Sequence, residues 1–130
     1  MNDSYKLLIV DDSKMMRNAI RGIFAADDRI QVAGEAADGE AALEIIPQID
    51  PDVLTMDVNM PVMDGLEATR RIRAEIAPER QPWIIAITAN VAAEDKQNCT
   101  EAGMNDFLEK PFAKAGFQRV LATVRDTMET

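Results

Sequence analysis

Short apolar runs, separated by segments of helical periodicity, constrain the fold of this chain more than any other feature. The first run, 6–10, is unbroken and ends at a pair of aspartates. Five runs have the length of a single β-strand: 6–10, 30–36, 52–56, 82–88 and 106–109. Strands that are apolar on both faces need cover on both sides of their sheet.

The segments between the runs carry apolar residues at helical spacing, which predicts a helix after each strand. The second helix is predicted over 38–46, because Pro47 ends the run. The fourth is predicted over 90–102, where Gly103 stops it. The other apolar stripes are Met16, Ile20, Ile23 and Phe24; Ala68, Ile72 and Ile76; and Phe117, Val120, Leu121 and Val124.

Strand and helix units in strict alternation predict one doubly wound α/β domain over residues 1–130. A parallel sheet with helices on both faces is the arrangement that buries both faces of such strands. The sequence contains no internal repeat, low-complexity tract or linker, so no output domain is expected.

The composition narrows the classes of function. With 14 Lys and Arg against 23 Asp and Glu, the net charge is −9, so direct nucleic-acid binding is not expected. No apolar stretch reaches the roughly 18 residues of a membrane span, and no signal peptide is visible, so a cytoplasmic protein is expected. The absence of histidine and the single Cys99 exclude disulfides, Cys/His zinc sites and imidazole catalysis.

Polar residues follow the predicted strands at the point where each strand ends. These residues are Asp11, Asp12, Asp57, Thr88 and Lys110. The carboxyl ends of parallel strands share one edge of the sheet, and ligands bind there at the reversal of strand order. Converging carboxylates favour a hard divalent cation such as Mg²⁺, while Lys110 and Thr88 suit the oxygens of a phosphoryl group. The residues therefore permit phosphoryl transfer onto an aspartate.

The sequence resembles the receiver domains of two-component response regulators over essentially its whole length. The motifs that carry the resemblance are Asp11-Asp12, the stretch 57–65, Thr88-Ala89 and Lys110-Pro111-Phe112, in that order. Each motif alone is weak, but together they are specific. The resemblance implies a flavodoxin- and CheY-like fold with a five-stranded parallel sheet in the order 2-1-3-4-5. In that order, the crevice lies between Asp11 and Asp57.

The resemblance also implies a role for the acidic residues. Asp57 would be the phospho-acceptor. Asp12, Asp57 and the backbone carbonyl of Asn59 would bind Mg²⁺ directly, and Asp11 would act mainly through water. Lys110 would contact the phosphoryl group and pair with Asp57 beforehand.

Other motif residues are implied to form the switch. Thr88 would supply the switch hydroxyl, Ala89 would be the small neighbour beside the phosphate, and the Lys110–Pro111 bond would be cis. Phe107 occupies the aromatic switch position, where many relatives have tyrosine, so the switch would act by packing and not through a hydroxyl.

Asn59 and Asn90 would flank the path of an attacking water and tune dephosphorylation. The donor would be a sensor histidine kinase or a histidine phosphotransfer protein. The signal would pass to a downstream protein or output domain through the fourth helix, the fifth strand and the last helix. Such a domain promotes only its own phosphorylation and dephosphorylation, so it is not expected to be an enzyme with a separate substrate.

Two other functions stay open at this point. A haloacid-dehalogenase-type phosphatase also uses a strand-end aspartate, Mg²⁺, Thr and Lys, although its nucleophile lies after the first strand. A receiver-like interaction module that is never phosphorylated is the second. The stretch 87–108 resembles receivers of hybrid histidine kinases, whereas Met1 and Asn59 resemble stand-alone regulators.

The aspartate pair and a group of three arginines also have purely structural interpretations. An Asp-Asp pair after a strand is usually a helix N-terminal cap or a solvated turn. Arg70, Arg71 and Arg73 suggest a docking patch, but Glu67 lies four residues before Arg71, which favours a solvated, ion-paired helix face.

Overall fold

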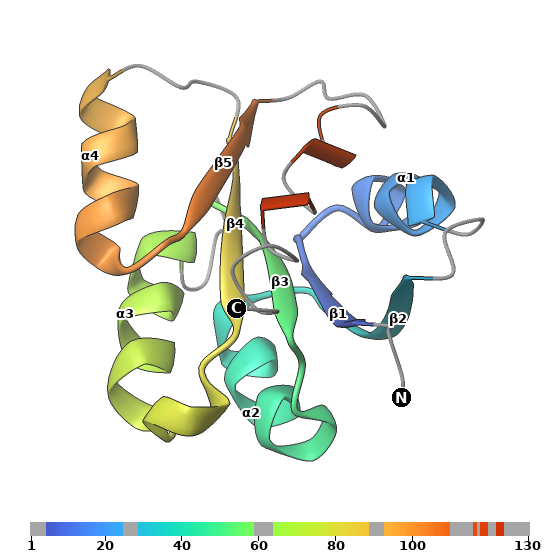
Figure 1. Ribbon diagram of the computed structural model, residues 1–130, viewed down its shortest axis with the longest axis horizontal. Helices are drawn as coiled ribbons and strands as arrows, with labels where there is room; N and C mark the ends of the chain where they lie inside the picture. The colour runs from blue at the N-terminus through green and yellow to red at the C-terminus, as the bar shows by residue number, and fades with distance from the viewer. Residues whose placement is uncertain are drawn as a thin grey trace.

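Five parallel strands form a single sheet in the computed structural model, in the order β2-β1-β3-β4-β5 (Figure 1). The strands are β1 (Tyr5–Val10), β2 (Ile30–Ala36), β3 (Val53–Asp57), β4 (Trp83–Thr88) and β5 (Asp106–Glu109). The structure describes residues 5–24, 29–58, 64–88 and 93–109, together with residues 116, 118, 119, 122 and 123. The predicted strands and the implied strand order are confirmed.

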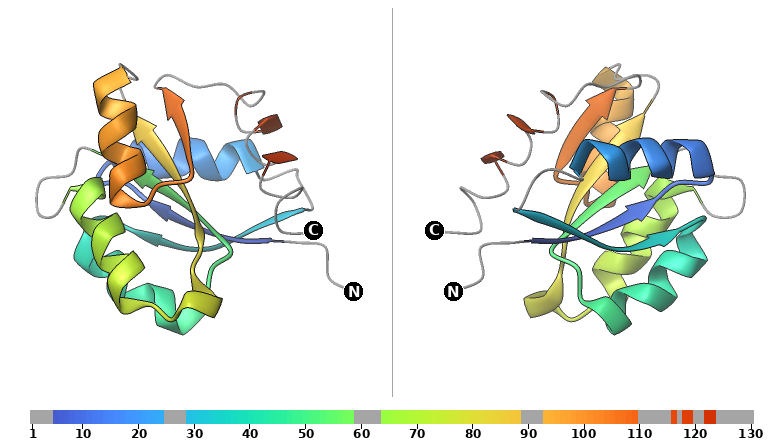
Figure 2. Two further views of the ribbon diagram at one scale, coloured as in Figure 1. Left: turned by 60° about the vertical axis from the view of Figure 1, so that its left-hand side comes forward. Right: turned by 90° about the vertical axis from the view of Figure 1, so that its right-hand side faces the viewer.

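Helices cover both faces of this sheet (Figure 2). The described helices are α1 (Lys14–Phe24), α2 (Gly39–Ile49), α3 (Gly65–Glu75), α4 (Ala93–Ala102) and the short 3₁₀ turn η1 (Pro78–Arg80). Residues 116, 118, 119, 122 and 123 are also helical, but Phe117, Val120, Leu121 and Val124 of the predicted last stripe lie outside the described residues. Within the described residues, no helix is both long enough and apolar enough to cross a membrane.

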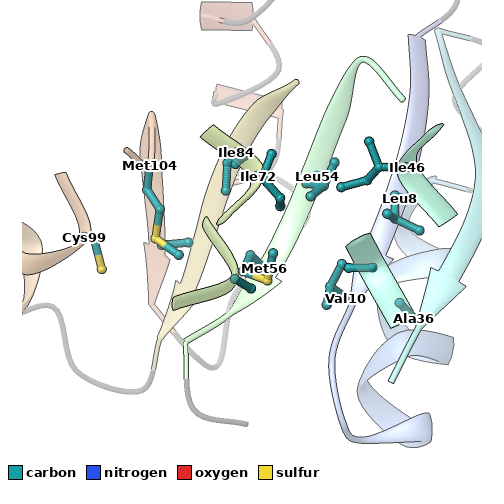
Figure 3. Packing of buried hydrophobic residues seen from close by; sticks show 13 residues of the cluster. Leu8, Val10, Ala36, Ile46, Leu54, Met56, Ile72, Ile84, Cys99 and Met104 are labelled. Atoms are coloured by element: carbon teal, nitrogen blue, oxygen red, sulfur yellow. The ribbon is translucent and has the colours of Figure 1, made fainter. Parts of the chain in front are cut away.

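Two apolar clusters, one on each face of the sheet, form the core. Leu8, Val10, Leu54 and Met56 point toward α2, α3 and α4, where they meet residues such as Ile72 (Figure 3). The alternate strand residues, among them Leu7, Ile9, Val53 and Ile85, pack with Ile20 and Phe24 of α1. Burial on both faces explains why the strands read as apolar runs and not as alternating patterns.

Pro47 does not end α2, contrary to the prediction. The helix continues to Ile49 and ends at Asp50, which adopts a left-handed conformation with φ of 52°. The Asp50 N–H donates to the Ile46 carbonyl at 2.8 Å, so the last turn closes around the proline. A proline so close to a helix end removes one backbone donor where few bonds remain to be lost.

The arginines of α3 divide into two groups. Arg70 pairs with Glu67 at 3.4 Å and Arg71 with Glu75 at 2.8 Å, which confirms a solvated, ion-paired face, although Glu67 takes Arg70 and not Arg71. Arg73 does not belong to this face. It is half-buried and bonds neutral acceptors, so the prediction was wrong for this residue.

Candidate functional site at the carboxyl edge of the sheet

The chain leaves β1 in one direction to form β2 and later returns to form β3 on the other side of β1. The carboxyl ends of β1 and β3 therefore flank the reversal point of the sheet, where a crevice opens in doubly wound folds. Asp11 follows the last residue of β1, and Asp57 is the last residue of β3. The predicted site lies at this edge.

Three carboxylates meet there. Oxygen atoms of Asp11, Asp12 and Asp57 all lie within 4.8 Å of one another. Asp11 and Asp57 are only 1% and 2% exposed, whereas Asp12 faces solvent. Like charges at this separation repel strongly when two of them are buried, so the arrangement favours a positive partner.

In the loop after β1, a residue other than the two aspartates caps α1. The Asp11 N–H donates to the Ala36 carbonyl at 3.1 Å, and Asp11 Oδ1 accepts from the Ser13 N–H at 2.9 Å. Ser13 Oγ accepts from the Met16 N–H at 3.2 Å, so Ser13 caps the helix. Asp12 forms no hydrogen bond or ion pair with the described part of the chain. The aspartates are therefore not the helix cap.

Gly65 packs directly on the backbone of Asp57. Its N–H donates to the Val58 carbonyl at 2.9 Å. A Cβ at this position would lie 2.4 Å from the Asp57 carbonyl oxygen and 2.9 Å from Val58 Cα. Only glycine permits so close an approach, so the first residue of α3 helps to set the position of Asp57.

An ion-paired cluster beside the site was not predicted from the sequence. Arg17 donates through Nη1 to the Asp11 carbonyl at 2.6 Å and through Nε to Glu35 at 3.0 Å. Arg21 donates to the same glutamate at 2.9 and 2.6 Å. The hydrogen bond from Arg21, with help from Arg17, holds the pKa of Glu35 below its ordinary value of 4.5. The spacing of Arg17 and Arg21, one helical turn apart, was the available signal.

Thr88 and Phe107 lie on the neighbouring strands. Thr88 is buried at the end of β4, and β4 pairs with β3 so that Ile87 lies opposite Asp57. Phe107 is half-buried on the edge strand β5 and packs against the cluster that contains Met56 and Cys99. Five predicted site residues lie outside the described residues: Asn59, Ala89, Asn90, Lys110 and Pro111.

The donor set fits a hard divalent cation. Mg²⁺ takes oxygen ligands, usually one or two carboxylates together with water and phosphate oxygens. Two buried carboxylates and an exposed one, within 4.8 Å of one another, match this preference.

Comparisons with known proteins agree on one family. Residues 7–122 match the model of the response regulator receiver domain. The chain belongs to the response regulator receiver family. Its acidic cluster is consistent with a phospho-acceptor aspartate and Mg²⁺ binding, and the receiver is a signalling module.

Solved structures share the fold of this receiver. The receiver domain of a sensor histidine kinase from Pseudomonas aeruginosa PAO1, solved with a magnesium ion in its active-site cleft, is 36% identical with a TM-score of 0.82. That match covers 95% of this chain and 98% of the other. Chemotaxis protein CheY4 of Vibrio cholerae is 31% identical with a TM-score of 0.81, covering 93% of this chain and 98% of the other.

Curated relatives are longer proteins. Protein-glutamate methylesterase/protein-glutamine glutaminase 4 of Geobacter metallireducens is 44% identical over 110 residues, which are 82% of this receiver and 30% of that protein. The receiver spans between 27% and 36% of the length of several curated relatives of this kind.

Replacing Gly65 with alanine should destabilise this receiver by about 1–3 kcal/mol, because the added methyl group forces the backbone of Asp57 to move. Gly22→Ala in α1 is the matched control, since nothing lies within 4 Å of its Cβ. That variant should be as stable as the wild type or more stable by up to about 1 kcal/mol. Urea unfolding measures both, and equal midpoints for Gly65→Ala and the wild type would contradict the close packing.

Glu35→Gln should lower stability near neutral pH by less than about 1 kcal/mol, because the ion pairs are partly exposed. Since folding lowers the pKa of Glu35, its contribution is present above the ordinary value of 4.5 and is lost as the pH falls through the lowered pKa. The stability difference from wild type should therefore shrink on acidification. Urea midpoints measured across this range, with the exposed Glu44→Gln as control, test the expectation.

Proposed function

We propose that Asp57 of this receiver accepts a phosphoryl group from a phosphohistidine on a partner protein. The observation that carries the proposal is the meeting of three carboxylates, two of them buried, at the reversal point of the sheet. A carboxylate oxygen of Asp57 attacks phosphorus, the bond from phosphorus to the imidazole nitrogen breaks, and the nitrogen keeps the electron pair. The product is an acyl phosphate on Asp57.

The proposed metal ligands are Asp12, Asp57 and the backbone carbonyl of Asn59, with Asp11 acting mainly through water. When bound, Mg²⁺ would neutralise charge on the phosphoryl oxygens and on the carboxylates. The magnesium ion in the cleft of the Pseudomonas receiver domain supports this proposal. Asp11, through its bond to the Ser13 N–H, also keeps the loop that carries Asp12 in place.

The remaining motif residues are proposed to form the switch. Lys110 would place a positive charge against the phosphoryl oxygens, and Thr88 would offer its hydroxyl to them. Ala89 would leave room for the phosphoryl group, and Pro111 would follow a cis bond. Phe107, half-buried on β5, would respond by a change of packing, because its ring offers no hydroxyl.

A receiver domain implies a histidine kinase as partner. The donor is proposed to be a sensor histidine kinase or a histidine phosphotransfer protein, and this receiver is proposed to act in the cytoplasm. The output is proposed to pass through α4, β5 and the helical residues after β5. The curated relatives, which are methylesterases about three times as long, support an output domain on the same chain as one form of target. Asn59 and Asn90 are proposed to tune hydrolysis of the acyl phosphate.

Acetyl phosphate with Mg²⁺ should add one phosphoryl group to the wild type, and Asp57→Asn should remove this labelling because the amide is not a nucleophile. Intact mass measures both results. Undiminished labelling of the variant would refute the assignment of Asp57. No labelling of the wild type would favour an interaction module, and turnover of a generic phosphate ester would favour a phosphatase.

Asp12→Ala should weaken Mg²⁺ binding on the order of tenfold or more and Asp11→Ala by less, because direct coordination exceeds a water-mediated contact. Amide signals of β1 and β3 followed during a Mg²⁺ titration measure the effect. The fluorescence of Trp83 is an unsuitable reporter, because Trp83 begins β4 at the amino edge of the sheet and Asp57 ends β3 at the carboxyl edge. Equal titration curves for both variants and the wild type would contradict the proposed ligands, and Glu44→Gln controls for lost charge.

A further inference from the structure

Arg73, near the end of α3, bonds the segment before β4 and the segment that links α4 to β5. Its Nε and Nη2 donate to the Gly103 carbonyl at 2.9 and 2.7 Å, just after α4. Its Nη1 donates to the Gln81 side chain at 2.8 Å and to the Pro82 carbonyl at 2.9 Å, just before β4. Its Nη2 also donates to Asn105 Oδ1 at 2.7 Å, just before β5.

None of these acceptors is a carboxylate. Burial lowers the pKa of Arg73, but a guanidinium stays charged in proteins. The Gly103 carbonyl lies at the carboxyl end of α4, where the helix dipole is negative and favours a cation. The half-buried charge of Arg73 is therefore compensated by neutral oxygens and by this end of α4. Moving the end of α4 away would leave Nε of this half-buried cation without its acceptor and would remove one of the two acceptors of Nη2.

The end of α4 is shaped to receive the guanidinium. The Met104 N–H donates to the Cys99 carbonyl and the Gly103 N–H to the Thr100 carbonyl, each at 3.0 Å, which is the pattern of a Schellman motif. Gly103 has φ of +111°, and a Cβ there would lie 2.8 Å from Arg73 Cγ. The glycine thus supplies both the turn and the space for the arginine stem.

Asn105 extends the connection into the sheet. Its N–H donates to the Ile84 carbonyl and its Oδ1 accepts from the Ile84 N–H, both at 2.8 Å. The same Oδ1 accepts from Arg73. Arg73, Gly103 and Asn105, which we name the α4 anchor, therefore lie at the amino edge of β4 and β5. Asp57 lies at the opposite edge, toward which the chain runs through Thr88 before it enters α4 at Ala93.

From this geometry we propose that Arg73 is a positioning residue that fixes the carboxyl end of α4, so that the response to phosphorylation is confined to the amino half of the helix. The confined response rests on the proposed function of Asp57. The anchor itself exists without phosphorylation. α3 and α4 lie on the same face of the sheet, so that the arginine reaches across from one to the other (Figure 1).

The first experiment tests the anchor in the unmodified protein. Arg73→Met keeps an aliphatic stem but removes every donor, so amide hydrogen exchange at Gly103, Met104 and Asn105 should accelerate tenfold or more, with β1 and β3 unaffected. Arg70→Met, three residues earlier on the same helix and exposed, should leave these rates unchanged. Unchanged exchange in Arg73→Met, or equal acceleration in both variants, would overturn the anchor. Arg73→Lys, which keeps the charge but loses the planar fork, gives the same test if Arg73→Met does not fold.

The second experiment tests the confinement of the response. On addition of acetyl phosphate and Mg²⁺, amide shifts of the wild type should change over 93–97 and stay constant over 102–105. In Arg73→Met the changes should spread to 102–105, while Arg70→Met keeps the wild-type distribution. Uniform changes along α4 in the wild type, or a wild-type distribution in Arg73→Met, would overturn the inference. If intact mass shows no phosphoryl group on the wild type, the proposed function and the confined response both fail, and hydrogen exchange alone decides the anchor.

Discussion

The parallel pairing of β1 with β3 is the constraint on which the site depends. The register joins Leu7 to Val53 and ends with Val10 beside Met56, one residue before each of the two buried aspartates. Because side chains alternate between the faces of a strand, a slip of one residue in either strand would send one of the carboxylates to the other face. The apolar runs that drive this pairing therefore also determine that Asp11 and Asp57 meet.

The neighbouring strands complete the site from either side. β2 supplies the Ala36 carbonyl to the Asp11 N–H and presents Glu35 to Arg17, which in turn bonds the Asp11 carbonyl. On the other side, the Ile87 carbonyl of β4 accepts from the Val58 N–H, just beyond Asp57. The backbone around the acidic cluster is thus held by hydrogen bonds from both neighbouring strands.

Much of this arrangement follows from local sequence patterns. The strands could be predicted, because strand ends are visible as the points where apolar runs stop. The meeting of Asp11, Asp12 and Asp57 followed only once the family resemblance had implied the strand order. The end of α2 could not be predicted. A proline marks a helix end only when no later N–H closes the turn, and here the Asp50 N–H closes it. The bonds from Arg73 to Gly103 join residues 30 apart, and no periodicity reports which carbonyl a distant arginine reaches.

The carboxyl and amino edges of the sheet differ in how their charges are balanced. At the carboxyl edge, three carboxylates lie within 4.8 Å of one another, so a change of charge there alters the balance of forces strongly. At the amino edge, Arg73 is held by neutral oxygens and by the end of a helix, and these acceptors do not titrate. Under the proposal that Arg73 anchors α4, a change of charge at the carboxyl edge would alter the amino end of this helix and leave its carboxyl end in place.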